Sequence, residues 1–182
     1  MPIFKKSKVD QLAKAGDVAG LIGLITGPNP APERADAIHA LPMFTEEVEA
    51  RHRDAVRAAL ANAAQDPDPE VRCSALFAVG EFGWTDSAER LIAGTDDSEW
   101  MVRVFAVAIL GRFPGDLTVA RLDAVLANDS EGMVREAAAS SLGELRDPAS
   151  LESLRRAAAE DADREVRKAA KQAVRRVEGG SA

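Results

Sequence analysis

The sequence predicts an all-α solenoid of about five helical pairs. A seven-residue segment recurs nearly unchanged as DPDPEVR, DSEWMVR, DSEGMVR and DADREVR, at 66–72, 97–103, 129–135 and 161–167. The Val residues of these segments, at 71, 102, 134 and 166, stand 31, 32 and 32 residues apart, and a fixed period in this range is typical of a solenoid. The composition is 46% hydrophobic but only 4% aromatic, without Tyr, which favours closely packed helices over sheets.

Each segment carries the residues that start a helix. Two acids precede every Val, five and three residues before it, where they can cap backbone N–H groups and favour the positive end of the helix dipole. The Val then opens an apolar stripe that continues at positions +4, +7, +8 and +11, as in Ala75, Ala78, Val79 and Phe82. Gly80, Gly111 and Gly143 stand at position +9, where they are expected to relieve crowding or let the chain turn.

An Arg follows every Val and can reach acids of its own segment or of the next one. Repeated along the stack, these contacts predict a ladder of charge-assisted hydrogen bonds. Its expected members are Asp66, Arg72, Asp97, Arg103, Asp129, Arg135, Asp161 and Arg167. Because the pattern recurs once per repeat, whereas a catalytic group is normally needed once, we interpret the ladder as structural.

These residues resemble HEAT repeats, in particular the short type first recognised in bilin lyase subunits. The pattern D-x-x-x-x-V-R-x-x-A-A-x-A-L-G-x-L is matched by Asp66–Phe82, Asp97–Phe113 and Asp129–Leu145, and by Asp161–Val177 except that Arg175 replaces the Gly. The resemblance implies antiparallel helices A and B in each repeat, stacked into a right-handed α-α superhelix. It also implies that each Val-Arg pair opens a B helix and that the B helices line the inner face.

The A helices fall between the motifs. The first, Lys8–Ile25, is expected to break at Gly16, with Asp17 capping a second short helix. A long A helix is expected over Thr45–Gln65, with a capped start at Thr45, and shorter ones begin at Ser87, Leu117 and Pro148.

The first B helix, Pro32–Phe44, is degenerate. It has Glu33-Arg34 in the Val-Arg place and Pro28 in the place of the Asp. End repeats of a solenoid usually depart from the pattern in this way, because one of their faces meets water.

These elements predict one HEAT-repeat domain over residues 1–178. It would contain an irregular repeat at 7–44 and regular repeats at 45–82, 83–114, 115–146 and 147–178, followed by a disordered tail at 179–182. The last B helix carries a run of cations: Arg164, Arg167, Lys168, Lys171, Arg175 and Arg176. They suit either an anion or nucleic-acid contact or a solvated end of the stack, and we favour the solvated end.

Charge and cysteine content narrow the class of partner. The net charge of −7 opposes non-specific binding to nucleic acid and to anionic membranes. The single Cys, Cys73, cannot form an internal disulfide, which suits a reducing compartment. The sequence shows neither the apolar segment of a signal peptide nor a run long enough to span a bilayer. We therefore expect a cytoplasmic protein without a membrane partner.

A second stripe on the B helices is the candidate binding face. Positions +2, +6 and +10 lie away from the core stripe and would project toward the inner face. Its N-terminal half is apolar, which is typical of a site for a peptide or a partner helix. The candidate contacts are His39, Met43, Cys73, Phe77, Val104 and Arg112. The alternative is that tight curvature or the first four residues cover them, and the sequence leaves both open.

Few residues in the sequence suit an enzymatic activity. Cys73 would need a base, for which His39 is the one candidate, so we interpret it as a thiol at the edge of the core. A di-iron hydroxylase of this fold would need paired His-Glu steps, whereas His39 and His52 are followed by Ala and Arg. Zinc ligation is equally unsupported.

The sequence thus predicts a non-enzymatic scaffold without catalytic residues, metal or cofactor, whose partner is another protein or peptide. The alternatives are a bilin lyase or chaperone-like subunit and, with less support, a HEAT-like nucleic-acid-binding protein or DNA glycosylase. The oligomeric state stays open, with a monomer favoured.

Overall fold

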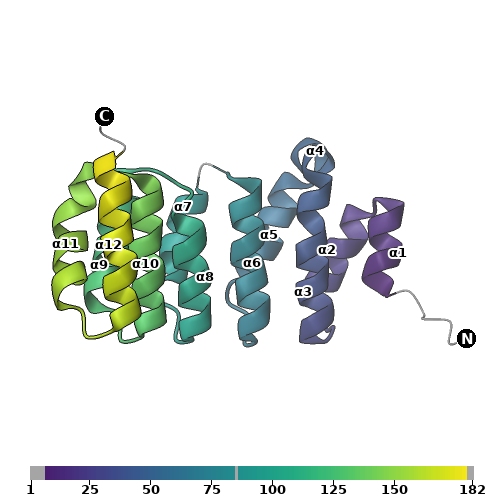
Figure 1. The fold of residues 1–182 in the computed structure, drawn as a ribbon. Coiled ribbons are helices and arrows are strands. Elements are labelled where there is room, and N and C mark those ends of the chain that lie inside the picture. Colours follow the sequence, from purple (N-terminus) through teal and green to yellow (C-terminus); the bar gives the residue numbers. More distant parts are fainter. Residues whose placement is uncertain (1–6, 85, 180–182) are drawn as a thin grey trace, which may run out of the picture. The chain divides into compact units, whose positions relative to one another are not determined.

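The computed structural model describes residues 7–84 and 86–179, and within those ranges every regular element is a helix (Figure 1). The predicted all-α solenoid class is thereby confirmed. Contacts within the chain divide it into two compact units, residues 1–84 and 85–182. A single domain over residues 1–178 stays a prediction.

Unit 1 contains the irregular N-terminal repeat and the first regular motif. Its helices are α1 (Lys8–Ala15), α2 (Val18–Thr26), α3 (Ala31–Ala40), η1 (Leu41–Phe44), α4 (Thr45–Glu47), η2 (Val48–His52), α5 (Arg53–Ala63) and α6 (Pro69–Phe82). The expected break falls at Gly16, which ends α1 in a left-handed conformation with φ 66°. Asp17 caps α2 as expected, because its Oδ1 accepts the amide of Gly20 at 2.8 Å.

The segment from Thr45 differs from the single capped helix that the sequence predicts. Pro42 lacks the N–H that would continue α3, so the chain tightens into the 3-10 turn η1 and stays helical into α4. The Thr45 hydroxyl donates to the Pro42 carbonyl at 2.9 Å and caps no helix. The π turn η2 then absorbs one extra residue. As a result Val48 and Val56, both fully buried, share one face.

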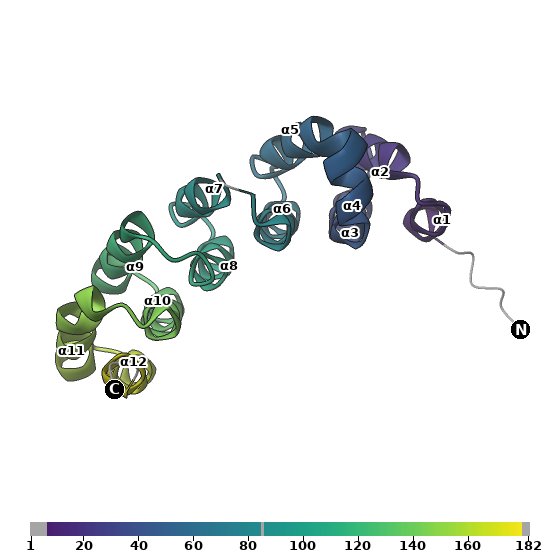
Figure 2. The same ribbon diagram turned by 90° about the horizontal axis from the view of Figure 1, so that it is seen from above.

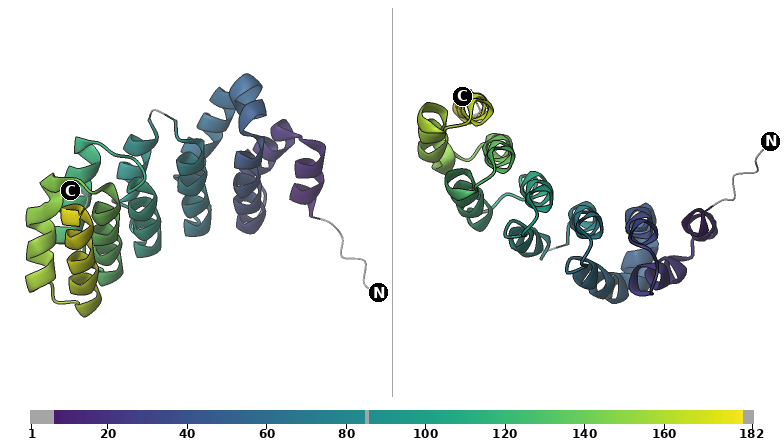
Figure 3. Two further views of the ribbon diagram at one scale, coloured as in Figure 1. Left: turned by 45° about the horizontal axis from the view of Figure 1, so that its top comes forward. Right: turned by 90° about the horizontal axis from the view of Figure 1, so that it is seen from below.

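Unit 2 contains three helical pairs in two layers. Its elements are α7 (Ser87–Gly94), α8 (Trp100–Leu110), α9 (Asp116–Asn128), α10 (Gly132–Leu145), η3 (Pro148–Ser150), α11 (Leu151–Glu160) and α12 (Arg164–Gly179). Figure 2 shows α7, α9 and α11 in one layer and α8, α10 and α12 in the other. The view from below in Figure 3 shows the same two layers. The first residue of the predicted tail, Gly179, is still helical, and residues 180–182 lie outside the described part of the chain.

The motif Val residues lie in the core, where Val71, Val102, Val134 and Val166 are at most 1% exposed. Burial of such a side chain contributes about 1.5–3 kcal/mol. Gly111 and Gly143 lie where neighbouring B helices approach closely. A Cβ on Gly143 would lie 2.7 Å from Cβ of Ala173, and one on Gly111 would lie 2.7 Å from Cβ of Ser141. These two glycines therefore relieve crowding rather than turn the chain.

Candidate functional site

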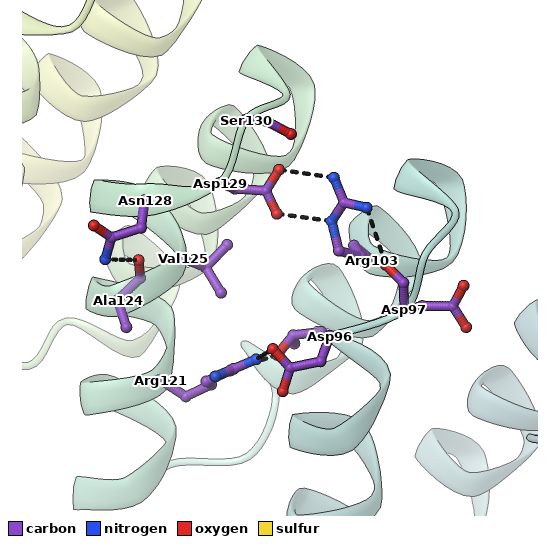
Figure 4. Close-up of a pocket in the computed structure, with 10 residues that line it drawn as sticks. Asp96, Asp97, Arg103, Arg121, Ala124, Val125, Asn128, Asp129 and Ser130 are labelled. Carbon is purple, nitrogen blue, oxygen red and sulfur yellow. Dashed lines mark hydrogen bonds and ion pairs between the residues drawn. The ribbon is translucent and has the colours of Figure 1, made fainter.

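In unit 2, the motif Arg of one repeat donates two parallel hydrogen bonds to the ladder Asp of the following repeat. We call such a guanidinium an arginine fork. Nε and Nη2 of Arg103 donate to Oδ2 and Oδ1 of Asp129 at 2.8 and 2.9 Å (Figure 4). Nη1 donates at 3.0 Å to the carbonyl of Asp97, in the motif's own turn. Arg135 repeats this arrangement, with Asp161 at 2.9 Å from both nitrogens and the Asp129 carbonyl at 2.8 Å from Nη1. One guanidinium thus fixes its own turn and the junction to the next pair.

Unit 1 contains a fork that the sequence reasoning did not include. Arg34 donates to the Asp66 carboxylate, from Nε at 3.0 Å and from Nη2 at 2.7 Å. Nη1 of Arg34 donates to the carbonyl of Asn29, five residues earlier, as Nη1 of Arg103 and Arg135 does to Ser98 and Ser130. The signal was present in the sequence, since Arg34 occupies the place of the motif Arg. Arg72 also holds its own turn, because Nη1 donates to the carbonyls of Asp66 and Pro67.

Each ladder Asp also shapes the turn in which it stands. Oδ1 of Asp66, Asp97, Asp129 and Asp161 accepts the amide of the residue two positions later, at 2.8–2.9 Å. Such a side-chain turn holds the backbone in place before the helix begins. The second acid of the motif stands directly before the first helical residue. In α6 this acid is Asp68, whose Oδ1 accepts the amide of Glu70 at 2.9 Å.

The electrostatics of the ladder fit a structural role. Hydrogen bonding by Arg135 lowers the pKa of the Asp161 carboxyl, against the opposing effect of burial. Burial would raise the pKa of Asp129, but hydrogen bonds from Arg103 and from the Glu131 amide outweigh it and lower the pKa. The hydrogen bonds to these carboxylates raise the pKa values of Arg103 and Arg135. The pairs are therefore held in the ionised form.

In unit 1, the candidate binding residues do not form one continuous apolar face. His39 is exposed and lies against half-buried Phe77, with ring centroids 5.1 Å apart. Cys73 is buried, whereas Met43 in η1 is 75% exposed. The expected stripe is therefore interrupted between Phe77 and Met43.

The His39 ring lies against a buried serine of α6. Nε2 of His39 lies 3.0 Å from Oγ of Ser74, and the Ser74 hydroxyl donates to the Glu70 carbonyl at 2.8 Å. Because Ser74 is only 2% exposed, a substrate has no access to its hydroxyl.

In unit 2 the exposed apolar side chains lie mostly beside the stripe that the sequence indicates. Val104 is half-buried and Arg112 is exposed. Larger apolar surface comes from Met101 and Phe105 on α8 and from Met133 on α10, which are 46%, 44% and 59% exposed. We call Met101, Val104, Phe105 and Met133 the B-helix patch. Met101 and Met133 precede the motif Val, and a helical wheel would have placed that position beside +6 and +10.

Small polar cavities recur at the seams between stacked pairs. One of about 460 Å³ surrounds Arg103 and Asp129, and its other cation, Arg121, pairs with Asp96 (Figure 4). A second, of about 370 Å³, surrounds Arg34 and Asp66 in unit 1. Because these cations already hold carboxylates, the two cavities are features of the stacking and offer little to a ligand.

Across 7–84 and 86–179, no group of three His, Cys, Asp or Glu side chains is arranged to hold a metal ion. In those ranges no helix combines the length and apolarity needed to cross a bilayer.

Comparison with solved structures shows the fold. Human deoxyhypusine hydroxylase in complex with glycerol is similar over 94% of this chain and 77% of its own, with 22% identity and a TM-score of 0.59. A designed armadillo repeat protein is similar over 93% and 85%, with 15% identity and a TM-score of 0.60. The CpcE–CpcF complex of phycocyanin lyase from Nostoc is matched over 90% of this chain and 78% of its own, with 18% identity and a lower TM-score of 0.41.

Comparison of the sequence with curated proteins and with family models identifies the family of the chain. No curated protein sequence matches the chain significantly. The family model for HEAT repeats matches twice, over residues 18–103 and 88–175. Together with the arginine ladder and the paired helices, these matches show that the chain belongs to the HEAT-repeat family.

Proposed function

We propose that this protein is a non-enzymatic scaffold that binds a helix or peptide of another protein through its B helices. The B-helix patch carries the proposal. Monomeric proteins seldom leave large contiguous apolar patches exposed, and such patches are typical of protein-binding surfaces. Met side chains suit this use because they are flexible and polarisable, so they adapt to different apolar partners.

The architecture of the repeats supports the same function. The ladder and the close helix contacts at Gly111 and Gly143 occupy the turns and the flanks of the B helices. The stability of a solenoid comes from such neighbour contacts, so one face remains free to meet a partner. Val104, predicted from the sequence, belongs to this patch, and Arg112 follows the end of α8 as a charged candidate contact.

Affinity capture from a lysate of the source cells tests the proposal, with wild type compared to Met133→Asp. The matched control is Leu117→Asp, because Leu117 is 73% exposed but lies on the A helix α9. We expect Met133→Asp to lose a partner that wild type and Leu117→Asp retain, with unchanged melting of all three. Equal capture by both variants would contradict the use of this face.

A further inference from the structure

In the helical pair α11–α12, Arg167 makes the backbone contacts of an arginine fork but holds no carboxylate within the described residues. Nη1 of Arg167 donates to the carbonyls of Asp161 and Ala162 at 2.7 and 2.9 Å. Arg103 and Arg135 hold their own turns through the same two carbonyl contacts. Within residues 7–84 and 86–179, however, Nε and Nη2 of Arg167 bond to no acid, whereas the same atoms of Arg103 and Arg135 hold an Asp.

The surface around this fork is a cavity of about 580 Å³ between α11 and α12. It is larger than the 460 Å³ cavity at the Arg103–Asp129 junction, and it contains no ladder Asp. Its charged residues are Arg155, Arg167, Lys171, Arg175 and Glu178. Glu178 pairs with Arg155 at 2.7 Å, so the remaining three cations face the cavity in excess.

We propose that this cavity binds an acidic segment of a different protein chain, with one Asp carboxylate held by the Arg167 fork. A guanidinium whose position is already fixed loses little side-chain freedom on binding, and its planar fork matches a carboxylate. Lys171 and Arg175 supply long-range attraction for further acids of the segment. Ala158 and half-buried Val174 give the cavity an apolar wall for a neighbouring apolar side chain.

A second copy of this chain fits the cavity poorly. Stacking head to tail would bring the N-terminal repeat to α12, and that repeat has Pro28 in the place of the ladder Asp. Its own Arg34 already uses the Asn29 carbonyl there. Nucleic acid fits poorly as well, because the chain has a net charge of −7 and the cavity holds an apolar wall.

The probe is a fluorescein-labelled peptide with the sequence of residues 127–140, ANDSEGMVREAAAS, which contains the Asp129 that Arg103 holds in the folded chain. Fluorescence anisotropy with the full chain should show binding that Arg167→Gln weakens by about tenfold, since one bidentate pair is lost. Arg164→Gln is the matched control, because Arg164 is exposed on the same helix but does not line the cavity. It should change the affinity by less than about twofold.

Two further comparisons distinguish bidentate recognition by the Arg167 guanidinium from simple attraction between charges. Arg167→Lys should bind as weakly as Arg167→Gln, because an ammonium cannot pair both carboxylate oxygens. A peptide with Asn in place of its Asp should bind wild type about tenfold more weakly, since the same bidentate pair is lost. Equal losses in the Arg167→Gln and Arg164→Gln variants, full binding by Arg167→Lys, or no peptide binding at millimolar protein would overturn the proposal. Binding of a thymidine oligonucleotide in preference to the peptide would also overturn it. Circular dichroism melting checks that every variant is folded.

Discussion

Nε and Nη2 of Arg135 both lie 2.9 Å from the carboxylate oxygens of Asp161, which stands 26 residues later in the chain. The two side chains are only 15% and 9% exposed, so water screens the pair weakly. The junction between α10 and the last helical pair therefore depends on a buried, bidentate contact. Loss of one partner leaves the other charged and without its counter-ion.

Asp161→Ala should lower the free energy of unfolding by about 2–4 kcal/mol, because it strands the Arg135 guanidinium and frees the Asp163 amide. Urea denaturation followed by circular dichroism measures the change. Glu144→Ala, at an exposed position of α10, is the control and should shift stability by less than about 0.5 kcal/mol. Equal midpoints for the two variants would show that the ladder is not structural.

Lowering the pH should reduce the free energy of unfolding, because the ladder carboxylates become protonated. The pKa values of Asp161 and Asp129 are lowered from the ordinary 3.8, so their contribution to stability is complete above that value and disappears as the pH falls below it. Burial raises the pKa of Asp123, and its ionisation acts in the opposite direction. Unfolding free energies between about pH 2 and 6 should fall less steeply for Asp161→Asn than for wild type. Parallel curves would contradict this linkage.

Gly143→Ala should destabilise the protein by about 1–3 kcal/mol, because the added methyl would press against Ala173 and force α10 and α12 apart. Gly23→Ala is the matched control, since Gly23 lies within α2 and has no atom within 4 Å of its added Cβ. It should stabilise by about 0.5–1 kcal/mol through helix propensity. Thermal melts that move in the same direction for both variants would rule out the close approach.

Arg146→Gly should stabilise the protein by about 1 kcal/mol, since Arg146 ends α10 with φ 53° and glycine adopts that conformation without strain. Gly83 occupies the corresponding place after α6, with φ 59°. Gly83→Ala should therefore cost a similar amount. Chemical denaturation of the two variants provides the check, and a lower midpoint for Arg146→Gly would refute the strain.

The sequence predicts the parts of this fold that repeat. Asp129 and Arg135 recur with their neighbours at a fixed spacing, so the helical pairs and their turns could be placed before any coordinates. The segment around Pro42 and Val48 has no counterpart elsewhere in the chain, so its 3-10 and π turns could not be read from the pattern.

The candidate surface was harder to predict than the fold. A helical wheel places Met133 beside the candidate stripe, but its exposure depends on how the first turn of α10 meets its neighbours, which spacing alone does not specify. The sequence left open whether Phe77 is exposed, and in the structure it is half-buried and packs against His39.

The direction of the forks gives the growing chain an order of events. Arg103 leaves the ribosome before Asp129, and Arg135 before Asp161. In a nascent chain that folds from its N-terminus, the last folded pair of unit 2 therefore carries a guanidinium whose Asp partner is synthesised 26 residues later. Each new turn, already shaped by its own Asp, completes the junction behind it, so a stall in synthesis would leave one cationic fork unpaired beside the exposed flank of the last helical pair.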